Sequence, residues 1–329
     1  MSTRPAVLVA RAIFPDVVDR LRTTFEVEDN PQDTIYTPAE LAKRLKGKAG
    51  ALTTGSERVD AALLDANPQL RVVSNMAVGF NNFDVAACTQ RGVLCTNTPD
   101  VLTETTADFG FALMMAAARR MAESEHYLRR GEWTRWSYDM FTGSDVHGAT
   151  LGILGMGRIG QAIARRGALG FGMRVMYHNR HRLDPSLEAP LKAQYVDKET
   201  LLRQADHLVL VVPYSATSHH AIGAPELALM KPTATLTNVA RGGIVDDAAL
   251  AQALRERRIA AAALDVFEGE PQVHPELLKV PNVVLTPHIA SATVATRRAM
   301  ANLAVDNLIA ALTGAPPPSP INPEVLGQR

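Results

Sequence analysis

The stretch Thr150-Leu-Gly-Ile-Leu-Gly155-Met-Gly157-Arg-Ile-Gly160 decides the fold class of this chain. It joins a short apolar strand to the glycine pattern G-x-G-x-x-G, and a helical pattern follows over residues 161–169. In such a unit Gly155 permits the tight turn, Gly157 lets the backbone approach a pyrophosphate, and Gly160 allows close helix–strand packing. The N–H groups and dipole of the helix N-terminus favour that anion. The stretch therefore predicts a dinucleotide-binding turn that includes Arg158 and Ile159; the alternative is a glycine-rich turn without a ligand.

The end of the next strand, Val175-Met-Tyr-His-Asn-Arg-His-Arg182, indicates which dinucleotide is bound. NAD sites usually place Asp or Glu here to bond the ribose 2′-hydroxyl, and residues 174–183 contain neither. They contain Arg180 and Arg182 instead, and a guanidinium can bind a 2′-phosphate that a carboxylate would repel. We therefore predict NADP(H) as the preferred cofactor, with Arg180 as its main contact beside Asn179, and NAD(H) as the other cofactor accepted. The alternative is a solvated basic turn.

Strands and helices alternate on both sides of this stretch, as in βαβ units with parallel sheets. The second half of the chain has six strand candidates, which are 150–154, 174–177, 207–212, 234–238, 261–265 and 283–286. The first half has four, which are 6–10, 25–27, 50–54 and 70–74, and one long helix is expected over 293–312. We predict an α/β protein with two Rossmann-like doubly wound domains and a cleft between them. Residues 1–103 and 293–329 would form the substrate-binding domain, and residues 104–292 the dinucleotide-binding domain.

Composition excludes several other classes. The 329 residues carry 34 basic and 34 acidic side chains, so the excess positive charge of a nucleic-acid binder is absent. Two cysteines, Cys88 and Cys95, cannot form a disulfide framework. The longest uncharged apolar run, 109–118, is well under the roughly 20 residues that span a bilayer. We expect a cytoplasmic protein without nucleic-acid or membrane partners.

Three polar segments follow predicted strands of the second domain: Asn238-Val-Ala-Arg241-Gly, Asp265-Val-Phe-Glu-Gly-Glu270-Pro and Pro287-His288-Ile. Ligands of open α/β sheets bind beyond the carboxyl ends of the strands. With the glycine turn, these segments resemble the D-isomer-specific 2-hydroxyacid dehydrogenases over nearly the full chain. Thr103-Glu-Thr-Thr-Ala-Asp108, Asp145-Val-His147-Gly and the Arg180 region are similar to the bacterial glyoxylate/hydroxypyruvate reductases that also act on 2-ketogluconate.

The resemblance implies that Arg241, Glu270 and His288 are catalytic. Arg241 would bind the carboxylate and polarise the carbonyl of a 2-keto acid. His288 would donate a proton to the oxygen as hydride reaches the keto carbon, a role that suits the imidazole pKa of about 6.5. Glu270 would bond the other ring nitrogen and set the tautomer. For His288 alone, the alternative is a structural histidine.

The resemblance also places the substrate carboxylate against backbone amides of the loop that contains Val78 and Gly79. Two departures from the family are Asn81, where Asp is common, and Ala290, where Gly is common, and neither changes the three catalytic residues. Further cofactor contacts are implied at Thr106, Pro213, Val239, Ala240, Asp265 and Ser291. For Thr106 the alternative is an ordinary residue of a first helical turn.

Other features are explained without a ligand. Residues 107–121 are apolar nearly all round, which predicts a helix buried between domains or against a second subunit. Residues 125–148, with Trp133 and Trp136, are expected to form an irregular arm, and the two features together predict a homodimer. His219 and His220 are expected to be solvent-exposed and to point apart, with no Cys or Glu nearby, so no metal site is predicted.

The predicted function is NADPH-dependent reduction of glyoxylate, hydroxypyruvate or 2-ketogluconate to the D-2-hydroxy acid. Two alternatives stay open. One is a nucleotide-sensing corepressor that binds partners without turnover, and the other is an NAD-dependent dehydrogenase for another 2-hydroxy acid or for formate.

Overall fold

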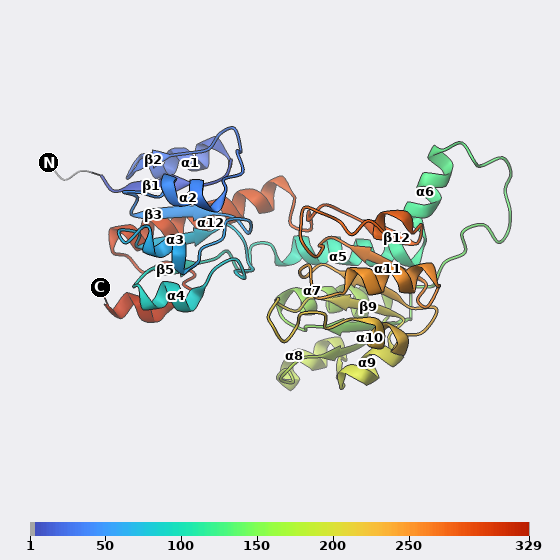
Figure 1. Cartoon of the computed structure of the whole chain (residues 1–329). Helices are drawn as coiled ribbons and strands as arrows, with labels where there is room; N and C mark the ends of the chain where they lie inside the picture. The colour runs from blue at the N-terminus through green and yellow to red at the C-terminus, as the bar shows by residue number, and fades with distance from the viewer. Residues whose placement is uncertain (1–3, 329) are drawn as a thin grey trace. The chain divides into compact units, whose positions relative to one another are not determined.

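The structure, a computed structural model, describes residues 4–328 and divides into two compact units. One unit contains the described residues up to Leu102 together with those from Ala292 onward, and the other is Thr103–Ser291. The predicted fold class, two α/β units built on parallel sheets, is confirmed (Figure 1). That one unit binds substrate and the other the cofactor stays a prediction.

The first unit has a five-stranded sheet in the order β2-β1-β3-β4-β5, with every pair of neighbours parallel. Its strands are β1 (Ala6–Val9), β2 (Glu26–Glu28), β3 (Gly50–Thr53), β4 (Val72–Asn75) and β5 (Leu94–Thr96). Its helices are α1 (Pro15–Arg22), α2 (Pro38–Arg44), α3 (Ala61–Asp65), α4 (Val85–Gln90) and α12 (Val294–Thr313), and a 3-10 segment covers Pro323–Gln328.

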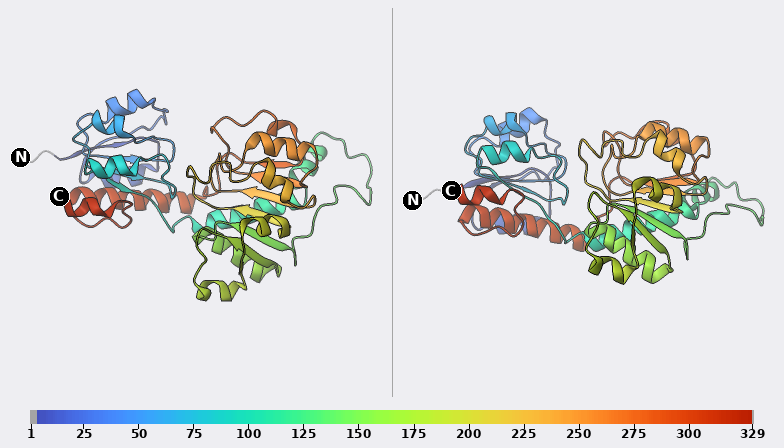
Figure 2. Two further views of the ribbon diagram at one scale, coloured as in Figure 1. Left: turned by 60° about the horizontal axis from the view of Figure 1, so that its bottom comes forward. Right: turned by 90° about the horizontal axis from the view of Figure 1, so that it is seen from below.

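Helices cover both faces of this sheet, which explains why its strands are apolar on both sides. Val7 and Val9 of β1 pack with α1 and α12, whereas Leu8 of the same strand packs with α2, α3 and α4. Helix α12, drawn in red, runs along one face of the sheet (Figure 2). The last helix of the chain therefore completes the core of the first unit.

The second unit has a seven-stranded parallel sheet in the order β12-β11-β10-β9-β6-β7-β8. Its strands are β6 (Thr150–Leu154), β7 (Arg174–His178), β8 (Gln194–Tyr195), β9 (His207–Leu210), β10 (Thr235–Asn238), β11 (Ala261–Leu264) and β12 (Val283–Leu285). The strand order reverses between β6 and β9, so the glycine turn after β6 lies at the topological switch point where such sheets bind ligands.

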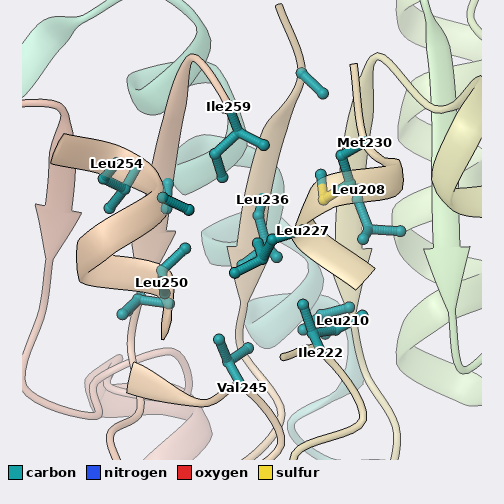
Figure 3. Packing of buried hydrophobic residues seen from close by; sticks show 14 of the residues in the cluster. Leu208, Leu210, Ile222, Leu227, Met230, Leu236, Val245, Leu250, Leu254 and Ile259 are labelled. Atoms are coloured by element: carbon teal, nitrogen blue, oxygen red, sulfur yellow. The ribbon is translucent and has the colours of Figure 1, made fainter. Parts of the chain in front are cut away.

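The helices of the second unit also cover both sheet faces. They are α5 (Thr103–Ala118), α6 (Met121–Arg129), α7 (Arg158–Arg165), α8 (Pro185–Glu188), α9 (Lys198–Gln204), α10 (Ala224–Leu229) and α11 (Asp247–Arg255), with a π-helical turn at Arg166–Gly170 and 3-10 turns at Ala189–Leu191 and Leu277–Lys279. Helices α5 and α7 pack on one face. Leucines of α9, α10 and α11 pack on the other, and Figure 3 shows Leu227, Leu250 and Leu254 against Leu208, Leu210 and Leu236 of the strands.

Several predicted elements differ from the structure. The short strands β5 and β8 were not predicted, because two or three residues carry no detectable periodicity. The helix predicted over 107–121 ends at Ala118, since Arg120 adopts the left-handed conformation (φ 53°) before α6 begins. It is not buried all round within the chain, because Asp108 and Ala112 are exposed. The arm begins only after α6, and no helix within residues 4–328 is both long and apolar enough to cross a bilayer.

Candidate active site

The polar segments singled out from the sequence follow neighbouring strands of the seven-stranded sheet. Arg241 lies after β10, Glu270 after β11 and His288 after β12, and these three strands are adjacent and parallel. Because their carboxyl ends share one edge of the sheet, the three loops meet there. The glycine turn after β6 and Arg180 after β7 follow strands of the same sheet at the same edge.

The glycine turn has a conformation that few other residues could adopt. Gly155 has φ +103°, and a Cβ on it would lie 2.7 Å from the Val211 carbonyl carbon. A Cβ on Gly160 would lie 2.3 Å from the Gly155 carbonyl oxygen, so α7 packs too closely on the turn for a side chain. Beside Gly157, in contrast, nothing lies within 4 Å of the Cβ position. The turn is thus closely packed at Gly155 and Gly160 and open at Gly157, so its backbone N–H groups there can bind a pyrophosphate.

Asn179 helps to shape this turn from the end of the neighbouring strand. The Met156 N–H donates to Asn179 Oδ1 at 2.7 Å, and the Gly155 N–H donates to the His178 carbonyl at 3.0 Å. Arg158 and Ile159 form the first residues of α7, whose N-terminal amides face the turn.

Arg180 and Arg182 differ in the freedom of their side chains. Arg182 donates to both carboxylate oxygens of Glu188 at 2.9 and 2.7 Å. With the Tyr177 hydroxyl, which also donates to Glu188, this ion pair lowers the pKa of Glu188 to about 2. Arg180 is exposed and makes no hydrogen bond or ion pair with any residue in 4–328. Only Arg180 of the two is free to bind an added anion.

Arg241 is positioned by the asparagine that ends β10. The Asn238 side chain accepts from the Ala240 N–H at 3.0 Å and donates to the Arg241 carbonyl at 3.1 Å, which closes the turn between them. The Arg241 guanidinium donates to the Ala240 carbonyl at 2.7 Å. Burial lowers the pKa of Arg241, and the negative charge of Glu270 opposes that effect. The clamp by Asn238 was not predicted, although an Asn at the end of a strand is a known turn signal.

Glu270 and His288 are hydrogen-bonded to each other. The Nδ1 of His288 lies 2.7 Å from Oε2 of Glu270, and Oε1 of Glu270 accepts from the Phe267 N–H at 2.9 Å. Burial alone would raise the pKa of Glu270, but His288, the Phe267 amide and Arg241 together bring that pKa below its usual value. The His288 ring is 44% exposed, and its Nε2 has no hydrogen-bond partner within the described part of the chain. Nε2 is therefore the ring nitrogen that is open to a ligand.

Asp265 holds the loop that carries His288. Its Oδ1 accepts from the Ile289 N–H at 2.8 Å and the Thr286 hydroxyl at 2.7 Å, and its Oδ2 accepts from the Ala290 N–H at 2.8 Å. The residue is fully buried. These bonds stabilise the left-handed backbone of His288 (φ 53°). Because Oδ2 already accepts from the Ala290 N–H, a nicotinamide carboxamide that bonds to this oxygen would share it with Ala290.

The remaining predicted cofactor residues lie in different surroundings. Thr106 is buried in the first turns of α5, Val239 and Ala240 are buried after β10, and Ser291 is half-buried after the His288 loop. Pro213 is exposed after β9. Their cofactor roles stay predictions.

In the first unit, Val78 and Gly79 lie in the loop after β4, and of their backbone groups only the carbonyls form hydrogen bonds within the described residues. The Val78 carbonyl accepts from the Asn97 side chain at 2.8 Å, and the Gly79 carbonyl accepts from the Asn75 side chain at 3.0 Å. The backbone N–H groups of Val78 and Gly79 have no partner among residues 4–328. Two adjacent unpaired amides are suited to a carboxylate.

His219 is exposed as predicted, but the two histidines do not point apart and a glutamate lies beside them. The rings are stacked, with centroids 3.9 Å apart, because His220 has a left-handed backbone (φ 49°) that departs from the alternation of a strand. Glu268, distant in sequence, lies beside them, and its Oε2 is 3.0 Å from His220 Nε2. No periodicity in the sequence signals a left-handed residue at this position.

Comparisons with known proteins agree with this geometry. Residues 111–290 match the family model described as D-isomer specific 2-hydroxyacid dehydrogenase, NAD binding domain. The chain is 48% identical over 327 residues to a glyoxylate reductase of Thermococcus gammatolerans. The aligned region covers 98% of this chain and 97% of the relative.

Solved structures show the same fold. A protein of Thermus thermophilus is 42% identical, with a TM-score of 0.88 over 96% of this chain and 99% of the other. An NADPH-dependent glyoxylate/hydroxypyruvate reductase of Sinorhizobium meliloti, solved with NADP and malonate, is 38% identical, with a TM-score of 0.85 over 97% of each chain.

Proposed function

Because the chain belongs to the D-isomer-specific 2-hydroxyacid dehydrogenase family and is an NAD(P)-dependent oxidoreductase, we propose that it reduces small 2-keto acids to D-2-hydroxy acids with NADPH. Glyoxylate is the first substrate proposed, since curated relatives at 48% and 47% identity are glyoxylate reductases. Hydroxypyruvate and 2-ketogluconate are the other two. A partner-binding protein without turnover is not favoured, because the family model describes a dehydrogenase and the curated relatives are reductases.

The observation that carries the proposal is the bond between His288 and Glu270 beside Arg241. A 2-keto acid presents a carboxylate next to a carbonyl, and the Arg241 guanidinium can contact both with charge-assisted hydrogen bonds. That the unpaired amides of Val78 and Gly79 bind the substrate carboxylate stays a prediction. A reduced nicotinamide cofactor, when bound, supplies the hydride.

The proton comes from His288. As negative charge develops on the keto oxygen, Nε2 of His288 donates its proton to that oxygen, and Arg241 stabilises the charge. Glu270 accepts from Nδ1, which leaves Nε2 as the nitrogen that donates the proton. Asp265 keeps the ring in place by holding the backbone on both sides of its loop.

The residues present fit a nicotinamide dinucleotide. The open backbone beside Gly157 and the amides at the start of α7 would hold the pyrophosphate. Preference for the 2′-phosphate rests on Arg180, because Arg182 is already neutralised by Glu188. The related reductase of Sinorhizobium meliloti, which was solved with NADP, supports this preference.

The proposal is tested by initial rates on glyoxylate, hydroxypyruvate and 2-ketogluconate with NADPH and with NADH. We expect the highest kcat/KM for glyoxylate with NADPH, and a D configuration wherever the product is chiral. No turnover of any of the three acids with either cofactor would overturn the proposed substrate class.

Arg180→Ala should weaken the binding of NADPH but not that of NADH. Loss of one charged hydrogen-bonding partner costs roughly 1.5–3 kcal/mol, so KM for NADPH should rise about 10- to 100-fold while kcat/KM with NADH stays unchanged. Lys192→Ala removes the same charge from another exposed position of the second unit and is the matched control. If both variants changed the two cofactors equally, Arg180 would not be the 2′-phosphate contact.

A further inference from the structure

Two histidines on one short segment of the second unit present their rings side by side. His219 and His220 follow Pro213 in the loop after β9, and their rings are parallel to within 23° with centroids 3.9 Å apart. The Nδ1 of His219 is 3.2 Å from the Tyr214 hydroxyl. An outer hydrogen bond of this kind on one ring nitrogen orients an imidazole so that the other nitrogen can bind a metal ion.

A carboxylate from another loop completes the cluster. Glu268 lies after β11, and one donor atom from each of Glu268, His219 and His220 lies within 4.8 Å of the others. Donors bound at about 2.1 Å to a tetrahedral ion are roughly 3.4 Å apart, so small side-chain rotations would bring all three onto one ion. Asp246 lies at the edge of the cluster, with Oδ2 4.0 Å from His220 Nδ1.

We propose that His219, His220 and Glu268 form a binding site for a divalent transition-metal ion, of which Zn²⁺ is the best match. Imidazole nitrogens with one carboxylate suit Zn²⁺, whereas Mg²⁺ and Ca²⁺ require oxygen donors. His219 and Glu268 are exposed, so a water molecule can fill the fourth position.

The site lies beside the loop of the proposed catalytic glutamate. Glu268 is two residues before Glu270, and its backbone N–H donates to the buried Asp247 carboxylate at 3.0 Å. A bound ion would link the segment after Pro213 to this loop. Metal binding is therefore expected to raise the thermal stability of the second unit.

His219 is the residue that distinguishes a metal site from a structural hydrogen bond. The bond between His220 and Glu268 needs no metal, and it stays intact when His219 is replaced. His219 has only Tyr214 as a hydrogen-bond partner in the described chain, so its removal should leave the fold unchanged. We expect tag-free protein to bind one Zn²⁺ per chain with micromolar affinity by isothermal titration calorimetry, and His219→Ala to weaken binding at least tenfold.

His126→Ala is the matched control, because His126 is exposed beside a single carboxylate, Glu125, without a second histidine. It should bind Zn²⁺ like the wild type, and Glu268→Gln should lose affinity like His219→Ala. Co²⁺ should give tetrahedral d–d absorption in the wild type but not in His219→Ala. Equal Zn²⁺ affinity in His219→Ala and the wild type, or no binding by the wild type, would overturn the proposal whatever the enzymatic activity.

Discussion

At the scale of single residues, side chains of the same type that are close in sequence differ in their hydrogen bonding. Arg182 is engaged by Glu188, while Arg180 is exposed and unpaired in the described chain. Asp265 is fully buried and bonds the backbone around His288, so its clearest role is to position the imidazole rather than to meet the substrate. Such differences in hydrogen bonding decide which side chains are free to act on a ligand.

His288→Ala should abolish most turnover while cofactor binding is kept. A positioned general acid contributes about 10²- to 10⁴-fold, so kcat should fall by that factor. Cofactor dissociation constants, measured by fluorescence quenching, should stay within about twofold because the glycine turn belongs to other loops. His126→Ala, far from the catalytic loops in the sequence, controls for loss of an exposed histidine. A wild-type kcat in His288→Ala would show that another group donates the proton.

At the scale of elements, helix α11 begins with an ionisable group in an unusual environment. Asp246 caps the helix by accepting from the Ala249 N–H at 2.9 Å. The next residue, Asp247, is buried, and burial is the main cause that raises its pKa from 3.8 to about 6. The N-terminal dipole of a helix favours a negative charge, but that contribution is small beside the cost of burial.

Asp247 should make the protein less stable as the pH rises from about 4 to about 6. Over this range the unfolded chain ionises before the folded one, so the folded state binds more protons and loses stability with pH. The pKa difference corresponds to about 3 kcal/mol at neutral pH. Asp247→Asn cannot ionise, so its stability relative to the wild type should increase across this range in urea unfolding at several pH values. A difference that does not vary with pH would contradict the assignment.

At the scale of the whole molecule, apolar side chains are exposed along α6 and the arm that follows it. The exposed fractions are 57% for Leu128, 52% for Trp133, 73% for Trp136 and 90% for Tyr138. Figure 1 shows this segment extending away from the seven-stranded sheet of its unit. Several large apolar side chains exposed on one segment are typical of protein interfaces, and we propose a homodimer that buries the arm.

Trp136→Ser should weaken that dimer. The wild type should sediment at twice the mass of the 35.5-kDa chain, and the variant should dissociate at low concentration. Ile35→Ser is a matched control, because Ile35 is 75% exposed but belongs to the other unit. Sedimentation velocity of a monomer at all concentrations, or equal effects of both variants, would contradict the role of the arm.

The sequence by itself determined the parallel α/β class, the glycine turn and most strand positions. These features depend on local patterns: apolar strands of four or five residues such as β6, helical periodicity, and glycines where a backbone needs space. The resemblance located Arg241, Glu270 and His288, and the geometry brings the last two together. Their catalytic roles stay predictions.

Only the tertiary structure decided that Arg180 is free, that Asp265 anchors the His288 loop, and that His219, His220 and Glu268 lie together. The anchoring by Asp265 and the His219–His220–Glu268 cluster depend on contacts between loops that are distant in sequence. Local periodicity cannot encode such contacts, because they form only when parallel strands bring their carboxyl ends to one edge of a sheet.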